Sequence, residues 1–448
     1  MTGTERTTLV ERFRERRYEL WVVGGALRDQ LLGLAERGDM DYATSALPDE
    51  VEAVATEAGL HTVGVGKRYG TIGVQIDGRW SEITTFRGDS YSEGSRWPDV
   101  TFGSSIAEDL ARRDFTINAL AEDAFTGKRL DLYGGADDLA RRLIRAVGEP
   151  ESRFREDPLR ILRGFRFASQ LDFEVEPATL EGMRRTVDLI PSLSQERVTA
   201  ELTKLLAGAR PSKGLGLLLA TGALPCVLPE LLPMPGCEQN RFHHYDVWGH
   251  TLATVDAMEL GENGSVRRWA ALVHDLGKPT VRHRKKNGEW GFYRHETVGG
   301  ELAQEMLGRL KLGHRDAETI ELLVRRHMER PELDDRRSIR RFMAKCEGHW
   351  RDLVALKRAD NASHTYDDTA YHDALEAACE RAETDDAEAL LARSPLDGNE
   401  LVAVFGREPG PWIRRVKEEL SARVLDGDLA PGDRERALAI ARSIVEGT

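Results

Sequence analysis

Two aspartates separated by one residue are the first feature of the sequence with clear chemical potential. Asp39 and Asp41 lie in the run Gly-Asp-Met-Asp. On a strand, alternate side chains project from the same face, so both carboxylates could bind one metal ion. Two divalent ions about 3.5–4 Å apart can activate a hydroxyl group and hold a leaving pyrophosphate. The pair alone does not decide the matter, because surface turns are also rich in aspartate.

A glycine turn just before this pair adds a place for phosphate. Gly24 and Gly25 follow an apolar run and precede Arg28. Glycines at a turn from strand to helix let backbone amides approach a phosphate, the helix N-terminus adds positive potential, and an arginine can pair with an oxyanion. A glycine pair by itself is more often only a turn. Turn, arginine and carboxylates together predict a triphosphate bound beside a metal ion.

Alternating short strands and helices must position these residues. The expected strands are 19–23, 40–44 and 129–133, with a hairpin over 71–86, and the expected helices are 26–32, 48–59 and 106–122. These assignments rest on β-like runs, on apolar spacing of three to four residues and on the turn residues between them. After about residue 145 the pattern is helical. It breaks at Pro191, 225–235 and 394–398, where we expect domain joints.

Composition limits the class of protein. The chain has 448 residues, 40% apolar and 31% charged, which predicts a folded protein of several domains. The sequence has no run of about 18 apolar residues and no apolar core of a secretory signal near its start, so we expect a cytoplasmic protein without a membrane span. The four cysteines form no CxxC pair, which argues against a disulfide scaffold and a cysteine zinc site.

The charge balance restricts how the chain could meet nucleic acid. A net charge of −13 argues against a protein that coats nucleic acid through bulk charge, although it permits a local basic surface. Residues 141–167 carry eight arginines and four acidic residues. This segment is either such a basic surface or a solvated helix face.

The glycine turn, the arginine and the acidic pair resemble the motif of the DNA polymerase β-like nucleotidyltransferase superfamily. Four more motifs follow in order: Glu-Ile-Thr-Thr-Phe-Arg at 82–87, Arg-Arg-Asp-Phe-Thr-Ile-Asn-Ala-Leu at 112–120, Asp-Leu-Tyr-Gly-Gly at 131–135 and Arg-Phe-Arg-Glu-Asp-Pro-Leu-Arg at 153–160. Together they are similar to those of class II CCA-adding tRNA nucleotidyltransferases of the bacterial type with an HD domain. The resemblance implies template-independent addition of CCA to the 3′ end of tRNA from CTP and ATP, with Mg²⁺.

The same resemblance implies roles for individual residues. Asp39 and Asp41 would be the catalytic metal ligands, and Glu82 a possible further acid. The nucleotide would be bound by Gly25, Arg28, Arg113, Asp114, Asn118, Asp157, Arg160, Arg163 and Arg166.

In the family, the equivalents of Asp157 and Arg160 read the incoming base. A carboxylate accepts from the exocyclic amino group that cytosine and adenine share, and a guanidinium donates to the ring nitrogen beside it. Uracil and guanine present the reverse pattern, so two side chains could replace a template. The alternative is structural, because Asp before Pro158 is also a normal helix N-cap. The two roles are compatible.

The polar segment between Arg87 and Val100 corresponds to a family loop that is tied to switching from CTP to ATP. It has full length here, whereas enzymes that add only C residues have it shortened or altered. Trp97 departs from the family pattern, in which a basic or polar residue stands beside the equivalent of Arg96. Without the resemblance, the segment would be interpreted as a surface loop.

A second set of metal-binding side chains lies in the helical half. His250, the adjacent pair His274 and Asp275, and Asp360 fall on successive expected helices and resemble the HD phosphohydrolase signature. Two imidazoles and two carboxylates suit Mg²⁺, Mn²⁺ or Ni²⁺, and a bound water could attack a phosphoester. The resemblance implies phosphatase or 2′,3′-cyclic phosphodiesterase activity. His295 and His327 either line the same pocket or are partly buried histidines with backbone partners.

Near the C-terminus, two turn-rich segments at 397–401 and 405–411 precede a helix with Arg414, Arg415 and Lys417. Free amides and basic side chains suit an RNA phosphate, although an ordinary interhelical loop explains the pattern equally well.

We therefore predict an α+β fold with a small mixed-sheet nucleotidyltransferase head followed by helical domains. The expected boundaries are 1–145 for the head, 146–225 for a helical neck with the base-reading helix, 226–390 for the HD body and 391–448 for a tRNA-binding tail. Expected partners are tRNA, CTP and ATP, with no membrane, and the chain would be a monomer or homodimer. The alternatives are a poly(A) polymerase, a partial enzyme that adds only CC or only A, and an HD phosphohydrolase with a relic head. A pure RNA-binding module is the least favoured alternative.

Overall fold

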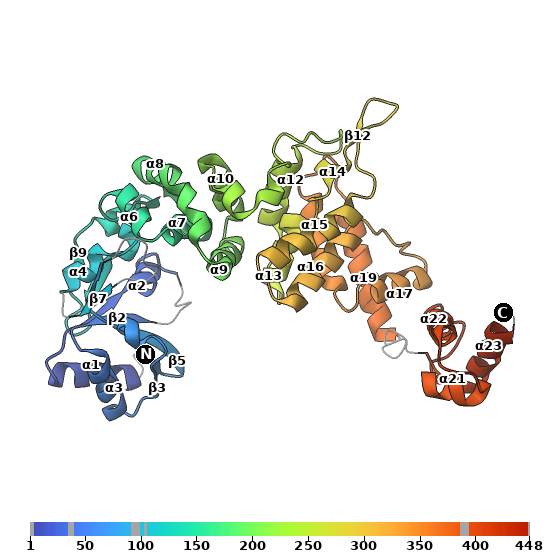
Figure 1. The fold of residues 1–448 in the computed structure, drawn as a ribbon, viewed down its shortest axis with the longest axis horizontal. Coiled ribbons are helices and arrows are strands. Elements are labelled where there is room, and N and C mark those ends of the chain that lie inside the picture. The colour runs from blue at the N-terminus through green and yellow to red at the C-terminus, as the bar shows by residue number, and fades with distance from the viewer. Residues whose placement is uncertain (1–3, 35–39, 91–98, 103–104, 386–393, 447–448) are drawn as a thin grey trace. The chain divides into compact units, whose positions relative to one another are not determined.

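The computed structural model describes residues 4–34, 40–90, 99–102, 105–385 and 394–446. The chain forms two compact units, Met1–Val227 and Leu228–Thr448. The first unit contains a sheet and helices, and the second is almost entirely helical (Figure 1). This agrees with the predicted α+β class.

One seven-stranded sheet organises the first unit, with strand order β3-β4-β5-β2-β1-β8-β9. Its strands are β1 (Leu20–Val23), β2 (Asp41–Thr44), β3 (Thr62–Val63), β4 (Thr71–Ile76), β5 (Arg79–Thr85), β8 (Leu120–Asp123) and β9 (Arg129–Asp131). All neighbours are antiparallel except β2 and β5, which run parallel. The predicted strands and the hairpin around Asp77 and Gly78 are therefore confirmed.

Burial alternates along β4 and most of β5, as expected for strands with one covered face. In β4, Ile72, Val74 and Ile76 are buried and their neighbours are half-exposed. Helices α1 (Thr4–Glu15) and α3 (Pro48–Glu57) pack against each other, and α3 packs on β3, β4 and β5 (Figure 1). Helix α3 begins with proline in its first turn, as predicted, and the Glu50 carboxylate accepts the backbone N–H of Leu47 at 2.7 Å.

Helix α2 (Gly24–Leu31) follows β1 directly, which confirms the predicted strand and helix, although the helix already begins at the glycines expected to form a turn. It packs on β1, β2 and β8 and on the 3₁₀ turn η2 (Thr116–Asn118). Helix α4 (Ile106–Ala111) packs on β2 and contributes Ile106 and Leu110 to a cluster with Phe86.

The predicted helix over 106–122 is wrong beyond Ala111, because distant backbone partners compete for residues 114–116. The N–H of Thr116 donates to the carbonyl of Arg145 at 2.9 Å, and the N–H of Val147 donates to the carbonyl of Asp114 at 3.1 Å. The Asp114 side chain also accepts the next backbone N–H, which opposes helix formation. The chain then enters β8 at Leu120.

Helices dominate the rest of the first unit. They are α5 (Gly135–Ala140), α6 (Pro150–Glu156), α7 (Leu159–Leu171), α8 (Pro177–Thr186), η3 (Val187–Ser192), α9 (Gln195–Leu206), α10 (Pro211–Thr221) and α11 (Leu224–Val227). Helix α7 is central and packs on α9 and α10. A Cβ on Gly164 of α7 would lie 2.2 Å from Met183 Cε and 3.0 Å from Phe115 Cζ, so glycine permits α7 to approach both residues. The remaining short elements are η1 (Lys67–Tyr69), β6 (Arg87–Ser90), β7 (Asp99–Phe102), β10 (Leu143–Ile144) and β11 (Glu174–Val175).

The second unit contains a helical body followed by three helices with a core of their own. The body comprises η4 (Pro229–Leu231), α12 (Val247–Ala257), α13 (Gly264–Val273), α14 (Lys278–Val281), β12 (His283–Arg284), β13 (Trp290–Gly291), α15 (His295–Arg309), α16 (His314–Arg326), α17 (Arg336–Lys345), α18 (Trp350–Asn361) and α19 (Thr369–Asp385). The last three helices are α21 (Gly398–Phe405), α22 (Pro411–Leu425) and α23 (Arg434–Glu446). Their shared core includes Leu401, Val416, Leu420 and Ala441.

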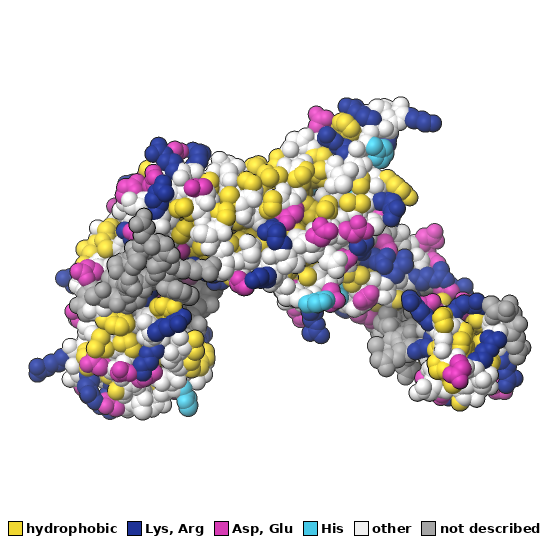
Figure 2. Space-filling model, in the orientation of Figure 1, with side chains coloured by type: hydrophobic (Ala, Val, Ile, Leu, Met, Phe, Trp, Pro, Cys, Tyr) yellow, Lys and Arg dark blue, Asp and Glu magenta, His cyan; other side chains and the backbone are white. Residues whose placement is uncertain are grey.

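Positive and negative side chains are interspersed on the face shown in Figure 2. This mixed surface is consistent with a net charge of −13 on a chain with many residues of both signs. Among the described residues, no helix is long and apolar enough to cross a membrane.

Candidate active sites

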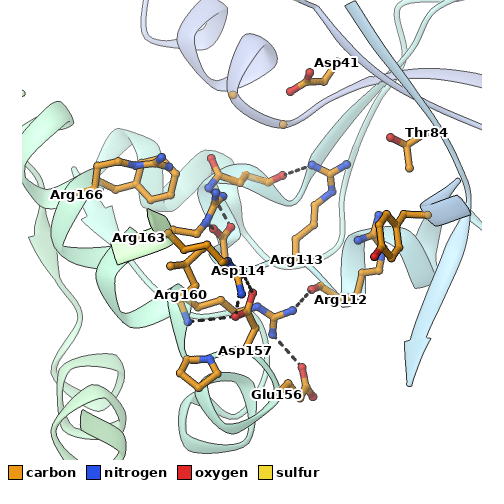
Figure 3. Close-up of a pocket in the computed structure, with 18 of the residues that line it drawn as sticks. Asp41, Thr84, Arg112, Arg113, Asp114, Glu156, Asp157, Arg160, Arg163 and Arg166 are labelled. Carbon is orange, nitrogen blue, oxygen red and sulfur yellow. Dashed lines mark hydrogen bonds and ion pairs between the residues drawn. The ribbon is translucent and has the colours of Figure 1, made fainter. Parts of the chain in front are cut away.

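A cavity of about 1800 Å³ in the first unit gathers the predicted nucleotide-binding side chains (Figure 3). It is lined by Gly25, Arg28, Asp41, Arg113, Asp114, Asn118, Asp157, Arg160, Arg163 and Arg166. These residues come from strands, loops and helices far apart in the sequence. Asp39 lies outside the described residues.

Two carboxylates stand side by side where the sheet forms one wall of this cavity. Asp41 and Glu82 are direct partners in the parallel register of β2 and β5, and both line the cavity. Gly24 has φ +75°, and a Cβ there would lie 3.2 Å from Asp41 Oδ2 and 3.3 Å from Arg113 NH1. Glycine is thus required at this turn by conformation and by space. The arrangement places acidic oxygens, a helix N-terminus and a guanidinium around one point.

Arg28 and Arg113 are fixed by hydrogen bonds to the same residue. Arg28 NH1 donates to Asn118 Oδ1 at 2.8 Å, and Arg113 NH1 donates to the backbone carbonyl of Asn118 at 3.3 Å. Arg113 NH2 also pairs with Asp109 Oδ2 at 3.0 Å. Asp109 is fully buried; burial raises its pKa, but Arg113 and Arg112 outweigh that effect and lower it. The two guanidinium groups are therefore positioned before any anion binds.

Asp114 joins the loop, the turn η2 and helix α7. Its Oδ1 accepts the N–H of Phe115 at 2.8 Å and Nδ2 of Asn118 at 3.0 Å, and its Oδ2 accepts Nε of Arg163 at 2.6 Å. Burial works to raise the pKa of Asp114, but Arg163 and these hydrogen bonds lower it to about 2. The carboxylate is therefore ionised at neutral pH.

The sequence analysis did not predict that three arginines pack against the aromatic ring of Phe167. The guanidinium carbons of Arg28, Arg163 and Arg166 lie 5.2, 5.4 and 4.4 Å from the centre of the Phe167 ring. Arg166 also pairs with Glu201 at 3.2 Å, and burial lowers the pKa of Arg166 to about 10. The position of Phe167 four residues after Arg163 on one helix was the available signal.

Asp157 and Arg160 both line the cavity but bind other groups. Asp157 Oδ1 accepts the N–H of Leu159 at 3.1 Å, as a residue before a helix often does, although Pro158 occupies the N-cap position itself. Arg160 NH1 donates to Glu156 Oε2 at 2.9 Å, and NH2 donates to the carbonyl of Arg112 at 2.8 Å (Figure 3). Their side chains are therefore held by neighbours, with Asp157 26% exposed toward the cavity.

In the second unit, the four predicted metal ligands meet. His250 lies on α12, His274 and Asp275 follow α13, and Asp360 lies on α18. His250 Nε2 is 2.9 Å from Asp360 Oδ1 and 3.2 Å from Asp275 Oδ2. His274 Nε2 is 3.3 Å from Asp275 Oδ2. Nitrogen and oxygen donors converge from three segments, which is the composition of a transition-metal site.

His295 and His327 lie close to the buried Asp275, and both also have backbone partners. His295 Nε2 lies 3.5 Å from Asp275 Oδ1, and His327 Nε2 lies 3.9 Å from it. Burial lowers the pKa of His327 to about 3 and also lowers that of His295. Both imidazoles are thus neutral at pH 7, which is the form that binds metals.

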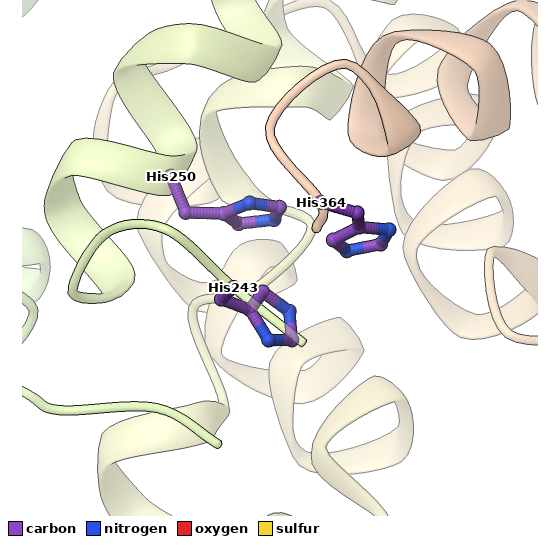
Figure 4. Close-up of side chains that lie close together, drawn as sticks. All are labelled: His243, His250 and His364. Atoms are coloured by element: carbon purple, nitrogen blue, oxygen red, sulfur yellow. The ribbon is translucent and has the colours of Figure 1, made fainter. Parts of the chain in front are cut away.

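Sequence reasoning also missed two histidines that surround His250 (Figure 4). The ring of His364 stacks on that of His250 at a centroid distance of 5.5 Å, and the ring of His243 meets it edge-on at 5.1 Å. Lys278 Nζ lies 2.6 Å from Asp275 Oδ2 and donates to Gln239 at 2.6 Å. Burial, and secondarily Lys278, lower the pKa of His243 to about 3.

The remaining predicted features are only partly described. Strands β6 and β7 pair antiparallel at the two ends of the loop that the resemblance ties to switching from CTP to ATP. Arg96 and Trp97 of that loop lie outside the described residues. In the tail, Arg414 pairs with Glu418 at 2.8 Å, and Arg415 donates to the carbonyl of Ile444 at 3.3 Å. Both cations thus have partners within the tail.

Known families cover most of the chain. Residues 20–145 match the family described as Poly A polymerase head domain, 172–234 match Probable RNA and SrmB- binding site of polymerase A, and 247–363 match HD domain. A solved CCA-adding enzyme of Bacillus stearothermophilus in complex with CTP is 26% identical, covers 100% of both chains and has a TM-score of 0.73.

Full-length relatives agree with these matches. The CCA-adding enzyme of Limosilactobacillus reuteri (strain DSM 20016) is 32% identical over 94% of this chain and 92% of its own length. The CCA-adding enzyme of Geobacillus stearothermophilus is 31% identical over 96% of this chain and 94% of its own. With the motifs clustered in one cavity and the relatives spanning almost the whole chain, the protein belongs to the family of CCA-adding enzymes.

Proposed function

We propose that the cavity of the first unit binds CTP and ATP in turn and adds CCA to the 3′ end of tRNA. The observation that supports this most strongly is the placement of Asp41 and Glu82 beside the Gly24 turn, opposite guanidinium groups fixed by buried carboxylates. Solved relatives have been described in complex with CTP, with tRNA and with a primer tRNA and an ATP analogue.

In this proposal Asp41, with Asp39, holds Mg²⁺, and Glu82 is a third acidic group at the same edge. Bound metal supplies charge neutralisation and an activated 3′-hydroxyl. The backbone of Gly24 and Gly25 approaches the phosphates at the start of α2. Arg28 and Arg113 pair with phosphate oxygens, and Asp114 and Asn118 position the ribose and these arginines.

Base selection in this proposal rests on Asp157 and Arg160. The Asp157 carboxylate is the more exposed of the two and accepts from the amino group of cytosine or adenine. Arg160 is held by Glu156 and the Arg112 carbonyl, which aim its guanidinium before the base enters. Arg163 and Arg166, packed around Phe167, complete the positive wall beneath the nucleotide.

We also propose a second activity at the HD centre. His250, His274, Asp275 and Asp360 would hold Mg²⁺, Mn²⁺ or Ni²⁺, and a water on that metal would hydrolyse phosphomonoesters or 2′,3′-cyclic phosphodiesters. The observation behind it is the convergence of imidazoles and buried carboxylates, including Asp275 at 1% exposure.

The proposed division of the chain remains 1–145, 146–225, 226–390 and 391–448, with the tail contacting tRNA. The end of the head match at 145 and the division between units at 227 support two of these boundaries. A cytoplasmic location and a monomer or homodimer complete the proposal.

The transfer activity is tested by replacing Asp41. We expect Asp41→Asn to lower nucleotide addition to a tRNA that lacks CCA by about a hundredfold or more, since a metal contact is worth several kcal/mol and each 1.36 kcal/mol is about tenfold in rate. The exposed Asp137 of α5 offers a matched control, Asp137→Asn, which should keep full activity. Products are resolved at single-nucleotide length with CTP, ATP or both.

The product pattern decides among the related activities. CTP alone should give CC, and ATP with CTP should give one terminal A. Long A tails would identify a poly(A) polymerase, arrest after CC would identify a partial enzyme, and equal rates for Asp41→Asn and the control would refute the site.

Base reading is tested with Asp157→Asn. An amide can donate as well as accept, so we expect the preference for CTP over UTP in kcat/KM to fall by about 10- to 100-fold, equivalent to about 1–3 kcal/mol. Asp188→Asn changes an exposed carboxylate of the same unit and should leave the preference intact. A lower rate with an unchanged CTP/UTP ratio would contradict a base-reading role.

The hydrolytic activity is tested with His274→Ala combined with Asp275→Ala. Wild-type protein with Mn²⁺ or Ni²⁺ should hydrolyse 2′,3′-cyclic AMP, and this double variant should lose the activity by at least about a hundredfold. Asp41→Asn should retain hydrolysis, and His283→Ala, at an exposed histidine, is the matched control. Hydrolysis at the wild-type rate by the double variant would refute the proposal.

A further inference from the structure

Most of the HD centre is closed to solvent, and its exposed side can be identified. The side chains of His250 and His274 are 0% exposed, and that of Asp275 is 1% exposed. The side chain of Asp360 is 17% exposed. His364, whose ring stacks on that of His250, is 11% exposed (Figure 4). A substrate therefore has to reach the centre on the side of Asp360 and His364.

Two exposed aromatic rings stand on that side. Tyr366 is 47% exposed, and its ring stacks on that of His364 at a centroid distance of 5.1 Å and an angle of 21°. Phe242 is 43% exposed, and its ring meets that of Tyr366 at 6.0 Å and 88°. The two rings thus form an aromatic corner with exposed apolar surface on both sides. Contiguous surface of this kind marks a binding site more often than scattered apolar side chains do.

Backbone pairing fixes the aromatic corner to the histidines behind it. The N–H of Thr365 donates to the carbonyl of Phe242 at 3.0 Å. Next to this bond, His243 and His364 are partners in an isolated antiparallel bridge. The segments that carry the two rings are therefore held together before any ligand binds.

The hairpin of β12 and β13, residues 282–291, brings positive charge beside this corner. It stands out from the helical body in Figure 1 and contains the cations Arg282, Arg284, Lys285 and Lys286. The single acidic residue of the hairpin, Glu289, pairs with Arg241 at 3.4 Å. The guanidinium of Arg241 also lies 5.1 Å from the centre of the Phe242 ring. Arg241 thus joins the hairpin to the aromatic corner.

Trp290 holds the two arginines of the hairpin. The guanidinium carbons of Arg282 and Arg284 lie 4.4 and 4.0 Å from the centre of its ring. Its Nε1 donates to Glu238 Oε2 at 3.1 Å, which ties the hairpin to the body. Lys285 and Lys286 are exposed, and within the part of the chain that the structure describes neither has an ion-pair partner. On a chain with a net charge of −13, such a cluster of cations suits a polyanion.

We propose that Phe242 and Tyr366 bind the terminal base of a single-stranded RNA 3′ end, while the hairpin 282–291 holds the phosphates that precede it. This inference rests on the proposed HD hydrolysis and names its substrate as the end of a polynucleotide. Single-stranded RNA is bound by aromatic rings on which bases stack and by cations that follow the backbone. A free mononucleotide would use the aromatic corner but not the hairpin.

The test compares an RNA end with a mononucleotide on the full chain. The substrates are a single-stranded RNA decamer that ends in a 2′,3′-cyclic phosphate and 2′,3′-cyclic AMP, with Mn²⁺ or Ni²⁺ and without CTP or ATP. We expect Lys285→Ala combined with Lys286→Ala to lower kcat/KM for the decamer by about fivefold or more and to weaken its salt dependence. The same variant should leave kcat/KM for cyclic AMP unchanged. Lys311→Ala combined with Arg315→Ala removes two exposed cations of the same unit and should change neither substrate.

The aromatic corner is tested with Phe242→Ala combined with Tyr366→Ala. Both substrates lose the stacked base, so kcat/KM should fall by about tenfold or more for each, mainly through a higher KM. Tyr366→Phe keeps the ring and should keep the activity, and matching thermal unfolding curves establish that the variants are folded. An aromatic variant with unchanged KM, or a hairpin variant that hydrolyses the decamer at the wild-type kcat/KM, would overturn the proposal.

Binding is also measured without hydrolysis, by photocrosslinking. A decamer with 4-thiouridine as its terminal base is crosslinked to the wild-type chain after chelation of metal, and the crosslinked peptides are identified by mass spectrometry. We expect crosslinks within residues 241–245 and 363–366, and fewer of them with the Lys285→Ala, Lys286→Ala variant. Crosslinks there without hydrolysis by the wild-type protein would support the RNA-binding corner and refute the proposed activity. Hydrolysis without such crosslinks would support the activity and refute the corner.

Discussion

The ion pair between the buried Asp114 and the partly exposed Arg163 is the interaction on which the first unit depends. Arg28, Arg163 and Arg166 surround one phenylalanine ring, and like charges at that spacing repel each other in a buried site. Asp114 compensates part of this repulsion, and its remaining bonds extend to Phe115 and Asn118. Through Asn118 the same network reaches Arg28. One carboxylate thus connects the turn η2 with helices α7 and α2, which form part of the cavity wall.

The HD centre also gathers groups of like charge in a buried place, but there the charges are negative. There, buried carboxylates and imidazoles gather around Asp275, and Lys278 pairs with one oxygen of that carboxylate. In the proposed function, polyphosphate would balance the arginines of the first unit, and a metal ion would balance the carboxylates of the second. Hydrogen bonds to backbone carbonyls fix many of the side chains before the ligand arrives, which reduces the entropic cost of binding.

Much of this arrangement could be predicted from the sequence, because the strongest signals are local. The glycine turn, the hairpin at Asp77 and the helical second half follow from residue type and spacing. The failures are long-range. The helix expected through residue 122 ends at Ala111 because residues 114–116 pair with the backbone near residue 146. Likewise, the register that sets Asp41 beside Glu82 and the packing of His243 and His364 around His250 have no local signature.

The most direct test of the account is a double-mutant cycle on Asp114 and Arg163, measured as kcat/KM for CTP addition. Asp114→Asn leaves Arg163 without this ion-pair partner, and Arg163→Gln leaves the charge of the buried Asp114 without it, so each single change should lower kcat/KM strongly. We predict that the double variant loses less than the sum of the two effects, with a coupling energy of at least about 1 kcal/mol. Additive losses would show that the two residues act independently and would contradict the claim that their contact organises the nucleotide site.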